Sequence, residues 1–223
     1  MGILLNGPNG PFVGRIGNTV YYMLEGVNVS RQIGKNNNPP SKQQLGNRIG
    51  TRLSGKFFCE VRAFVETGFG IEARAINDNA YNRAVKNNKK QMIEGKYPNL
   101  AINYSNILLS AGELKPAVAA KVSQTAEGLT FSWEITPKMP WPESTDQAMM
   151  LAYFPDENRS EYLLFGSERA SGTAELVLPP SLQGKYMETY LSFISSDRKQ
   201  VANSVYTGSL NKSALLDQPS AIS

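Results

Sequence analysis

The feature that most constrains the fold is a seven-residue alternation in the second half of the chain. From residue 129 to 135 the even positions are polar, whereas the odd positions are large and apolar: Leu129, Phe131, Trp133 and Ile135. Side chains point alternately to the two faces of a strand, so this segment predicts a strand with one buried face. A buried tryptophan adds a large apolar area to a core. We therefore expect a sheet structure built around Trp133.

This strand belongs to a series of short apolar runs that begins at Ala117. Turn-forming residues such as Ser171-Gly172 and Pro179-Pro180 separate the runs. Seven strands are expected, at residues 117–124, 128–136, 147–154, 161–167, 173–178, 186–194 and 200–208. Seven strands in about 90 residues are typical of an antiparallel β-sandwich.

A β-hairpin is expected near the N-terminus, after a glycine-rich stretch at residues 1–17 that is typical of loops or edges. Two strand-like runs, 18–24 and 27–33, flank Glu25-Gly26. The register across this turn pairs Tyr22 with Val29 and places one row of apolar residues on one face. The other face then carries Tyr21, Met23, Asn28, Ser30 and Gln32.

An amphipathic helix is predicted after the hairpin. Ser41 and Gln44 form a capping box directly behind Pro40. The apolar stripe runs over about six turns and consists of Leu45, Ile49, Leu53, Phe57, Val61 and Phe64. Small residues on the same helix would let another element approach closely, and they are Gly46, Gly50 and Gly55. Each of these glycines costs about 1 kcal/mol of helix propensity relative to alanine.

The chain up to residue 115 is expected to complete an N-terminal unit. A glycine-containing connector is predicted at 65–77, and a second amphipathic helix is capped by Asp78 and followed by Gly95. A further strand is predicted at 102–109. The predicted fold class is α+β: an N-terminal β-hairpin with two amphipathic helices, followed by a seven-stranded antiparallel β-sandwich.

Charge supports a division into units. Residues 1–115 contain 15 Lys+Arg and 7 Asp+Glu, whereas residues 116–223 contain 8 and 12. Such an asymmetry indicates two units and an anionic partner for the basic one. We expect an α+β unit at 1–115, the sandwich at 116–210 and a polar tail at 211–223.

Composition excludes several chemistries. The chain has no histidine, which removes Ser-His-Asp and Cys-His catalysis and histidine-ligated metals. Cys59 is the single cysteine, so no disulfide forms within the chain, and we interpret it as a small buried apolar residue. The carboxylate pairs lie in turns. We therefore expect no catalytic residue, no metal, no cofactor and no enzymatic activity.

Targeting signals are likewise not apparent. The apolar run near Met1 is about three residues long, shorter than the roughly seven to fifteen of a secretory signal. No apolar run approaches the roughly 18 residues that span a membrane. We expect a soluble, cytoplasmic protein, while a segment removed upstream would leave the compartment open.

Residues 117–208 resemble a fibronectin type III or immunoglobulin-like module. The resemblance rests on Trp133 in the second strand, on the end of the fifth strand at 176–179, and on Tyr190 in the sixth. It implies a fold and no function, because such modules host many functions.

The chain as a whole is similar to a bacterial family of unknown function, over about 200 residues. The resemblance implies no activity, substrate or cofactor. The segments that carry it are Gly14-Arg15-Ile16-Gly17-Asn18, Arg31, Asn38-Pro39-Pro40-Ser41 with Gln44 and Arg48, Tyr104-Ser105, Ser110, and Tyr206-Thr207-Gly208.

Three functions remain open, and the first is a non-enzymatic structural or protein-interaction role, as in an assembly. Its contact surface would combine Tyr21 and Met23 of the hairpin with the glycine-spaced helix, and its partner would be another protein or a second copy. The second is nucleic-acid binding by two basic rows, which consist of Arg48, Arg52 and Lys56 and of Lys86, Lys89 and Lys90. These rows are equally typical of solvated helix faces.

The third is carbohydrate or peptide binding by loops of the sandwich. Trp141 lies between Pro140 and Pro142 on a predicted long loop, and loops often carry binding residues. The alternative is that Trp141 folds back over the edge of a sheet.

Overall fold

The structure, a computed structural model, describes residues 2–4, 11–35 and 38–212. It is a mixed α+β protein whose described residues contain three α-helices and several antiparallel sheets. The chain forms two compact units, Met1–Ser41 and Lys42–Ser223. The boundary that we expect near residue 115 lies inside the second unit, because the helices before it share a core with strands after it.

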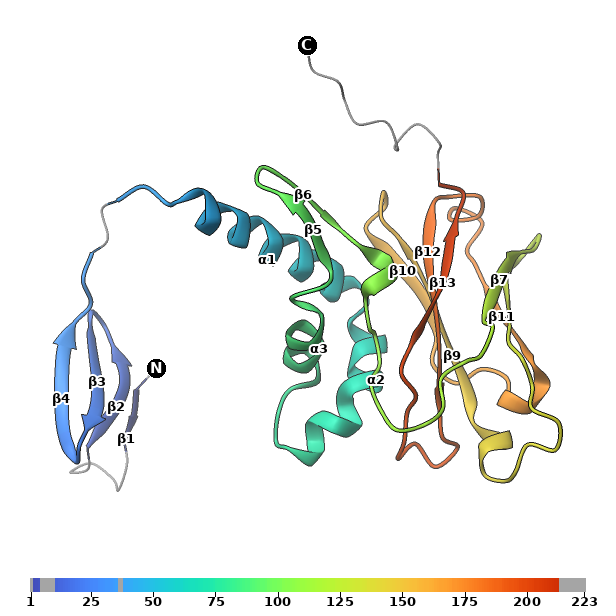
Figure 1. Ribbon diagram of the computed structural model, residues 1–223, viewed down its shortest axis with the longest axis horizontal. Coiled ribbons are helices and arrows are strands. Elements are labelled where there is room, and N and C mark those ends of the chain that lie inside the picture. Colours follow the sequence, from blue (N-terminus) through green and yellow to red (C-terminus); the bar gives the residue numbers. More distant parts are fainter. Residues whose placement is uncertain (1, 5–10, 36–37, 213–223) are drawn as a thin grey trace, which may run out of the picture. The chain divides into compact units, whose positions relative to one another are not determined.

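The first unit is a four-stranded antiparallel sheet with strand order β1-β2-β3-β4 (Figure 1). Its strands are β1 (Gly2–Leu4), β2 (Phe12–Ile16), β3 (Thr19–Leu24) and β4 (Val27–Gln32). Tyr22 pairs with Val29 and Leu24 with Val27, which is the expected register. The glycine-rich stretch before the hairpin contributes two strands of its own. Residues 5–10 of this stretch lie outside the described residues.

The second unit begins with the helices α1 (Lys42–Glu60), α2 (Arg62–Ala75) and α3 (Ala80–Asn88). The first starts directly after Ser41, as expected. The prediction of a connector at 65–77 is wrong, because α2 occupies most of it and buries Phe64, Val65 and Phe69. The cap of α3 is Asn79, whose side-chain oxygen accepts hydrogen bonds from two backbone N–H groups, and not Asp78.

A short hairpin follows α3 and consists of β5 (Ile93–Lys96) and β6 (Asn99–Ile102). Gly95 lies within it at φ +88°, and so it does not end the helix. The strand expected at 102–109 is also absent from this described segment. Tyr104–Asn106 forms a 3₁₀ turn, and the residues after it bond to Asn88 and Ser204 rather than to a strand ladder.

Two further sheets complete the unit, with strand orders β10-β9-β12-β13 and β11-β8-β7. Each of the seven expected segments overlaps one strand, although β10 begins before 161 and β13 extends beyond 208. The strands are β7 (Lys121–Gln124), β8 (Gly128–Ser132), β9 (Gln147–Phe154), β10 (Arg159–Leu163), β11 (Thr173–Val177), β12 (Met187–Ile194) and β13 (Val205–Leu210). The tail expected at 211–223 lies, from residue 213 on, outside the described residues.

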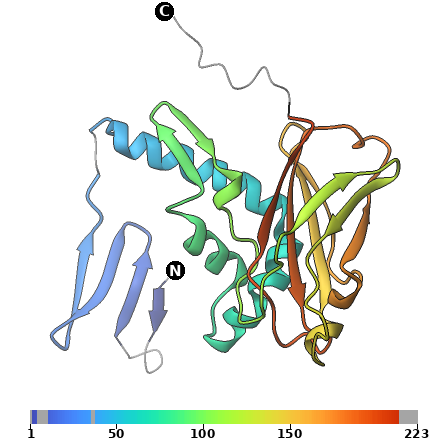
Figure 2. The ribbon, with the colours of Figure 1, turned by 45° about the vertical axis from the view of Figure 1, so that its right-hand side comes forward.

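The four-stranded sheet has an apolar cluster on each face. On β9, Met149, Leu151 and Tyr153 join the cluster formed with the helices. The intervening Ala148, Met150, Ala152 and Phe154 join the cluster shared with the three-stranded sheet. Figure 2 shows the helices and the three-stranded sheet on opposite sides of β9 and β12. This double burial explains why β9 is apolar from Ala148 to Phe154, since a strand covered on both faces shows no alternation.

Trp133 lies in the second of these clusters and is only 7% exposed. Its ring meets Phe193 edge-on at 5.2 Å, and its Nε1 donates a hydrogen bond to the carbonyl oxygen of Arg169. Ile135 departs from the expected alternation, because β8 ends at Ser132 and Ile135 is 42% exposed. Among the described residues, no helix has the length and apolarity needed to span a membrane.

Candidate functional site

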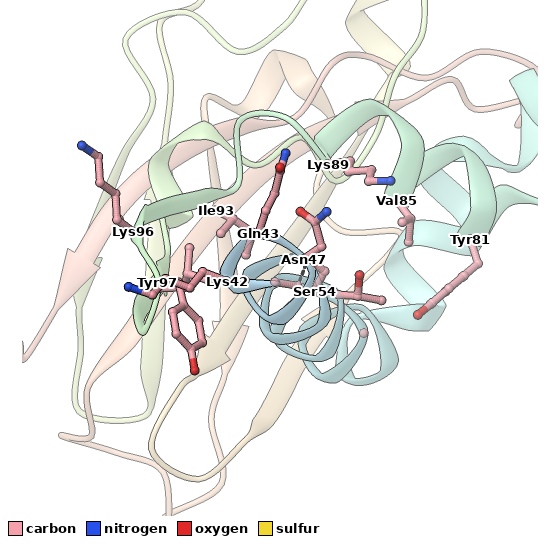
Figure 3. A pocket seen from close by; sticks show the side chains of 16 residues that line it. Lys42, Gln43, Asn47, Ser54, Tyr81, Val85, Lys89, Ile93, Lys96 and Tyr97 are labelled. Carbon is pink, nitrogen blue, oxygen red and sulfur yellow. Dashed lines mark hydrogen bonds between the residues drawn. The ribbon is translucent and has the colours of Figure 1, made fainter. Parts of the chain in front are cut away.

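A groove of about 670 Å³ lies in the second unit, between α1, α3 and the β5–β6 hairpin. Figure 3 shows it from close by, with Asn47 and Ser54 over α1 and Tyr81 and Lys89 on α3. Such a volume is within the range of pockets that bind small molecules or a few peptide residues.

The small residues of α1 create the groove. A Cβ at Gly46 would lie 3.6 Å from Cβ of Tyr97, and one at Gly50 would lie 3.7 Å from the side chain of Ile93. The hairpin therefore packs on the helix where side chains are missing. Gly55 also lines the groove, but a Cβ there would meet nothing within 4 Å. The glycine spacing of this helix predicts the close approach of another element, whereas the groove beside the contact was not predicted from the sequence.

The charge of the groove has one sign. Three lysines line it, and no carboxylate does. They are Lys42 at the start of α1, Lys89 at the end of α3 and Lys96 on the hairpin. In Figure 3, Lys96 extends outward from the hairpin. Because unopposed lysines raise the local positive potential, the groove favours ligands with negative charge.

Uncharged side chains supply the rest of the lining. Ser54 donates its hydroxyl proton to the carbonyl oxygen of Gly50 at 2.8 Å, which fixes its oxygen on the helix surface. Burial raises the pKa of the Tyr81 hydroxyl, so this phenol stays protonated and can donate a hydrogen bond. Apolar contact is available from Val85, Ile93 and Leu100.

Of the two predicted basic rows, only Lys89 lines the groove. Both rows are exposed: Arg48, Arg52 and Lys56 on α1, and Lys86, Lys89 and Lys90 at the end of α3. At 3.6 residues per turn, the row on α1 points away from the side that carries Gly46 and Gly50. The structure therefore does not gather the six side chains at one site.

The other predicted binding residues lie elsewhere. Trp141 is 80% exposed on the loop between β8 and β9, so it does not fold back over a sheet edge. Tyr21 and Met23 lie on one face of the first unit, where the ring of Tyr21 is 5.8 Å from that of Phe12. Met23 is 41% exposed.

A carboxylate that sequence reasoning missed lies beneath the helices, at Glu188 of β12. It is 3% exposed and accepts hydrogen bonds from the hydroxyls of Tyr186 and Tyr206. Burial, and then the bond to Glu188, raise the pKa of both phenols. No sequence signal marks this cluster, because its members come from strands paired across a sheet.

A second buried charged group is an ion pair between Asp146 and Arg169, at 3.0 Å. The guanidinium of Arg169 also lies 3.9 Å from the ring centroid of Phe193 and donates to the carbonyl oxygen of Lys115. These contacts join loops at one end of the sheets. Within the described parts of the chain, no three histidine, cysteine or acidic side chains gather closely enough to hold a metal ion.

Comparison with protein families identifies one match. The model of the Family of unknown function (DUF6266) matches residues 11–208. This agrees with the resemblance to a family of unknown function over most of the chain. No curated protein and no solved structure matches the sequence.

Proposed function

The chain belongs to the DUF6266 family of unknown function, and we propose that it is a non-catalytic binding protein that holds an extended acidic segment of a partner protein. The observation that carries this proposal is the groove on α1, which has three lysines and no carboxylate in its lining. This role is a form of the protein-interaction function expected from the sequence. It uses the glycine-spaced helix of the expected contact surface, whereas Tyr21 and Met23 of that surface do not line the groove.

The shape and lining of the groove support an extended peptide. The apolar side chains of Ile93 and Leu100 line the groove together with the charged side chains of Lys42 and Lys89. A strand-like peptide presents side chains alternately, so acidic residues can reach the lysines while apolar residues face the hairpin. The amide side chain of Asn47 is positioned to bond the peptide backbone.

A nucleic acid is less well supported, because most of the predicted basic residues do not line the groove. Arg48, Arg52 and Lys56 are on the other side of α1. Binding to the phosphates of a nucleic-acid strand requires cationic side chains placed along the length of that strand. Three lysines around one groove can instead pair with the carboxylates of a short acidic peptide segment.

The proposal is tested with a fluorescent peptide of alternating glutamate and leucine and a single-stranded oligonucleotide of equal length. Fluorescence anisotropy of the peptide should rise with protein at low salt. Lys42→Glu and Lys89→Glu should each weaken binding about fivefold. Gly55→Leu should abolish it, because the new side chain enters open groove space.

The matched control is Lys56→Glu, which makes the same charge change on an exposed part of α1 outside the groove. Binding should be unchanged. Peptide binding that survives Gly55→Leu would refute the groove as the site. Tighter binding of the oligonucleotide, reduced by Lys56→Glu, would favour nucleic-acid binding instead.

We further propose that β7 to β13 form a fibronectin type III-like sandwich. Support comes from the strand orders β11-β8-β7 and β10-β9-β12-β13 and from the apolar cluster that the two sheets share. Two antiparallel sheets packed over a shared apolar core are the architecture of such modules. The module would serve as a scaffold for the helices that carry the groove.

One observation favours a second candidate, carbohydrate or peptide binding at Trp141. An exposed fraction of 80% is unusual for tryptophan, which is largely buried in most proteins. Tryptophan fluorescence, measured against a panel of glycans and proline-rich peptides, tests this candidate. The spectrum of wild type should change with a ligand, and that of Trp141→Ala should not. No change across the panel would remove the candidate.

A further inference from the structure

The first unit has the strand pairing of a stable sheet but no second layer. Its strands form one sheet, and no residue in the ranges 11–35 and 38–41 of the unit is buried. A sheet is stabilised by burying one apolar face against another layer, since hydrogen bonds along strands contribute little net free energy. The sheet therefore requires a partner for one of its faces.

The register identifies which face is apolar. Residues opposite one another share a face, so the pairs Val20–Arg31, Tyr22–Val29 and Leu24–Val27 define one side. From β2, Val13 and Arg15 join it through their neighbours on β3. We call this side the valine face, and its members are Val13, Arg15, Val20, Tyr22, Leu24, Val27, Val29 and Arg31.

The valine face is most exposed near the Glu25 turn, where Leu24 is 56% and Val27 63% exposed, whereas Val13, Val20, Tyr22 and Val29 are half-buried. The opposite side is apolar on β2 and β3, where Phe12 packs near Tyr21, but it is polar on β4, so its apolar surface does not extend across the β3–β4 pair as that of the valine face does. Charge on the valine face is confined to one end. Arg15 and Arg31 flank Val20 in one row across three strands.

We propose that the valine face is a homodimer interface, in which two copies of this sheet pack face to face. Pairing at the open edge of β4 would extend the sheet but would leave both faces uncovered. Packing of faces supplies the missing layer. The same patch then serves on both copies, as two-fold symmetry requires.

Charge decides the orientation of the two copies. A two-fold axis along the strands would place the arginine row of one copy on the arginine row of the other. An axis across the strands reverses them, so that Arg31 of one copy faces the Glu25 turn of its partner. The row Val13–Tyr22–Val29 then lies on the axis and meets its own copy.

The sheet face spans about 20 Å along the strands and about 20 Å across them, or roughly 400 Å² per copy. Two such faces bury about 800 Å² in total, which is below the roughly 1,200–2,000 Å² of stable specific interfaces and in the range of weak, transient ones. A reversible dimer that forms at micromolar protein is therefore expected, and not a permanent one.

The test is sedimentation equilibrium of the full chain over about a hundredfold range of concentration. Wild type should be a reversible dimer. Arg31→Glu and Glu25→Lys should each weaken dimerisation about fivefold to tenfold, because each places like charges together. The double variant Arg31→Glu, Glu25→Lys should return to within about twofold of wild type.

A matched control is Ser30→Glu, on the same strand but on the opposite face. It should dimerise like wild type. Because the double variant restores the pair, loss of folding cannot mimic the expected pattern. A monomer at every concentration overturns the proposal. A dimer whose dissociation constant is the same in the charge variants as in wild type also overturns it.

Cross-linking gives an independent measurement of the symmetry axis. In a Cys59→Ser background, Val29→Cys places a thiol on the axis, and Ser30→Cys places one on the outer face. Sheets pack about 10 Å apart, within the span of a short bismaleimide reagent. Val29→Cys should yield covalent dimer and Ser30→Cys should not. Equal yields from the two would overturn the assignment of the face.

Discussion

Gly68 on α2 packs directly against Ser110 of the segment that follows the 3₁₀ turn. A Cβ at Gly68 would lie 2.5 Å from Cβ of Ser110 and 2.6 Å from the carbonyl oxygen of Leu109. The backbone of α2 and the 107–110 segment therefore touch, and the carbonyl of Gly68 accepts a hydrogen bond from Ala111 N at 3.2 Å. The hydroxyl of Ser110 in turn donates to Ala202 O at 2.8 Å. The contact joins the helices to the sheet.

Gly68→Ala should therefore destabilise the second unit. The added methyl group displaces backbone and not a flexible side chain, so we expect a loss of about 2–3 kcal/mol. Urea denaturation followed by circular dichroism measures it. Gly70→Ala on the same helix is the control, since a Cβ there meets nothing within 4 Å. It should stabilise by about 0.5–1 kcal/mol. Equal effects would contradict the close-packing explanation.

The buried pair of Asp146 and Arg169 should be far more sensitive to losing one partner than to losing both. Their side chains are 3% and 5% exposed. Asp146→Leu or Arg169→Met alone leaves an unpaired buried charge and should cost about 3–5 kcal/mol. The double variant should be less destabilised than either single one. A double-mutant cycle from urea midpoints tests this, and simple additivity would contradict it.

The strands β7 to β13 were predictable because turns and apolar runs are local signals, whereas β5 and β6 were missed. The alternation at 129–135 identified β8, although the strand ends at Ser132, and each further apolar run after Ala117 located a strand. The hairpin register followed from Glu25-Gly26 alone. A local sequence pattern thus predicts those elements in which buried and exposed residues recur with a regular period along the chain.

The helices were harder to predict where tertiary contact overrides local preference. Glycine has a low helix propensity, so Gly68 suggests a break in the helix. It is nevertheless the residue that allows α2 to touch Ser110. Similarly, Gly95 suggests a helix end by its residue type, but it lies in the β5–β6 hairpin. A Cβ at this position would lie 2.2 Å from the carbonyl oxygen of Asn99, so the two strands approach closely where the side chain is missing. A glycine indicates either flexibility or close approach, and sequence alone does not distinguish them.

The groove could be predicted only in part. Its floor follows from Gly46 and Gly50, which indicate that another element packs on α1. Its walls come from the hairpin around Tyr97, and that hairpin was predicted as the end of a helix. The lysines of the groove lie on three separate elements, so no spacing in the sequence groups them.

Asn88 at the end of α3 provides a third prediction. Its side chain is fully buried, donates to Ala84 O and Leu108 O, and accepts from Leu108 N at 2.7 Å. Asn88→Leu leaves both backbone groups of Leu108 without these bonds and should cost about 2–4 kcal/mol. The neighbouring exposed Asn87→Leu should change stability by less than about 0.5 kcal/mol. Thermal unfolding of the two variants compares them, and similar melting temperatures would contradict the role of Asn88.

The tyrosines around Glu188 predict a loss of stability at alkaline pH. Burial raises the pKa of Tyr104, Tyr190 and Tyr206, and it raises that of Tyr153 to about 12. A phenol whose pKa is higher in the folded state loses its proton first in the unfolded state. Its contribution to stability is therefore complete below about pH 10 and falls as pH rises toward about 12.

Urea midpoints measured between about pH 8 and pH 11 should thus fall steeply above pH 10. Tyrosinate absorbance should show a fraction of phenols that ionise only together with the loss of circular dichroism. Glu188→Gln removes the charged acceptor of Tyr186 and Tyr206 and should cost about 1–3 kcal/mol at neutral pH. It should also lower the pKa of Tyr206, because the carboxylate is one of the causes of its rise. If all phenols titrate while the protein remains folded, these tyrosines do not limit its alkaline stability.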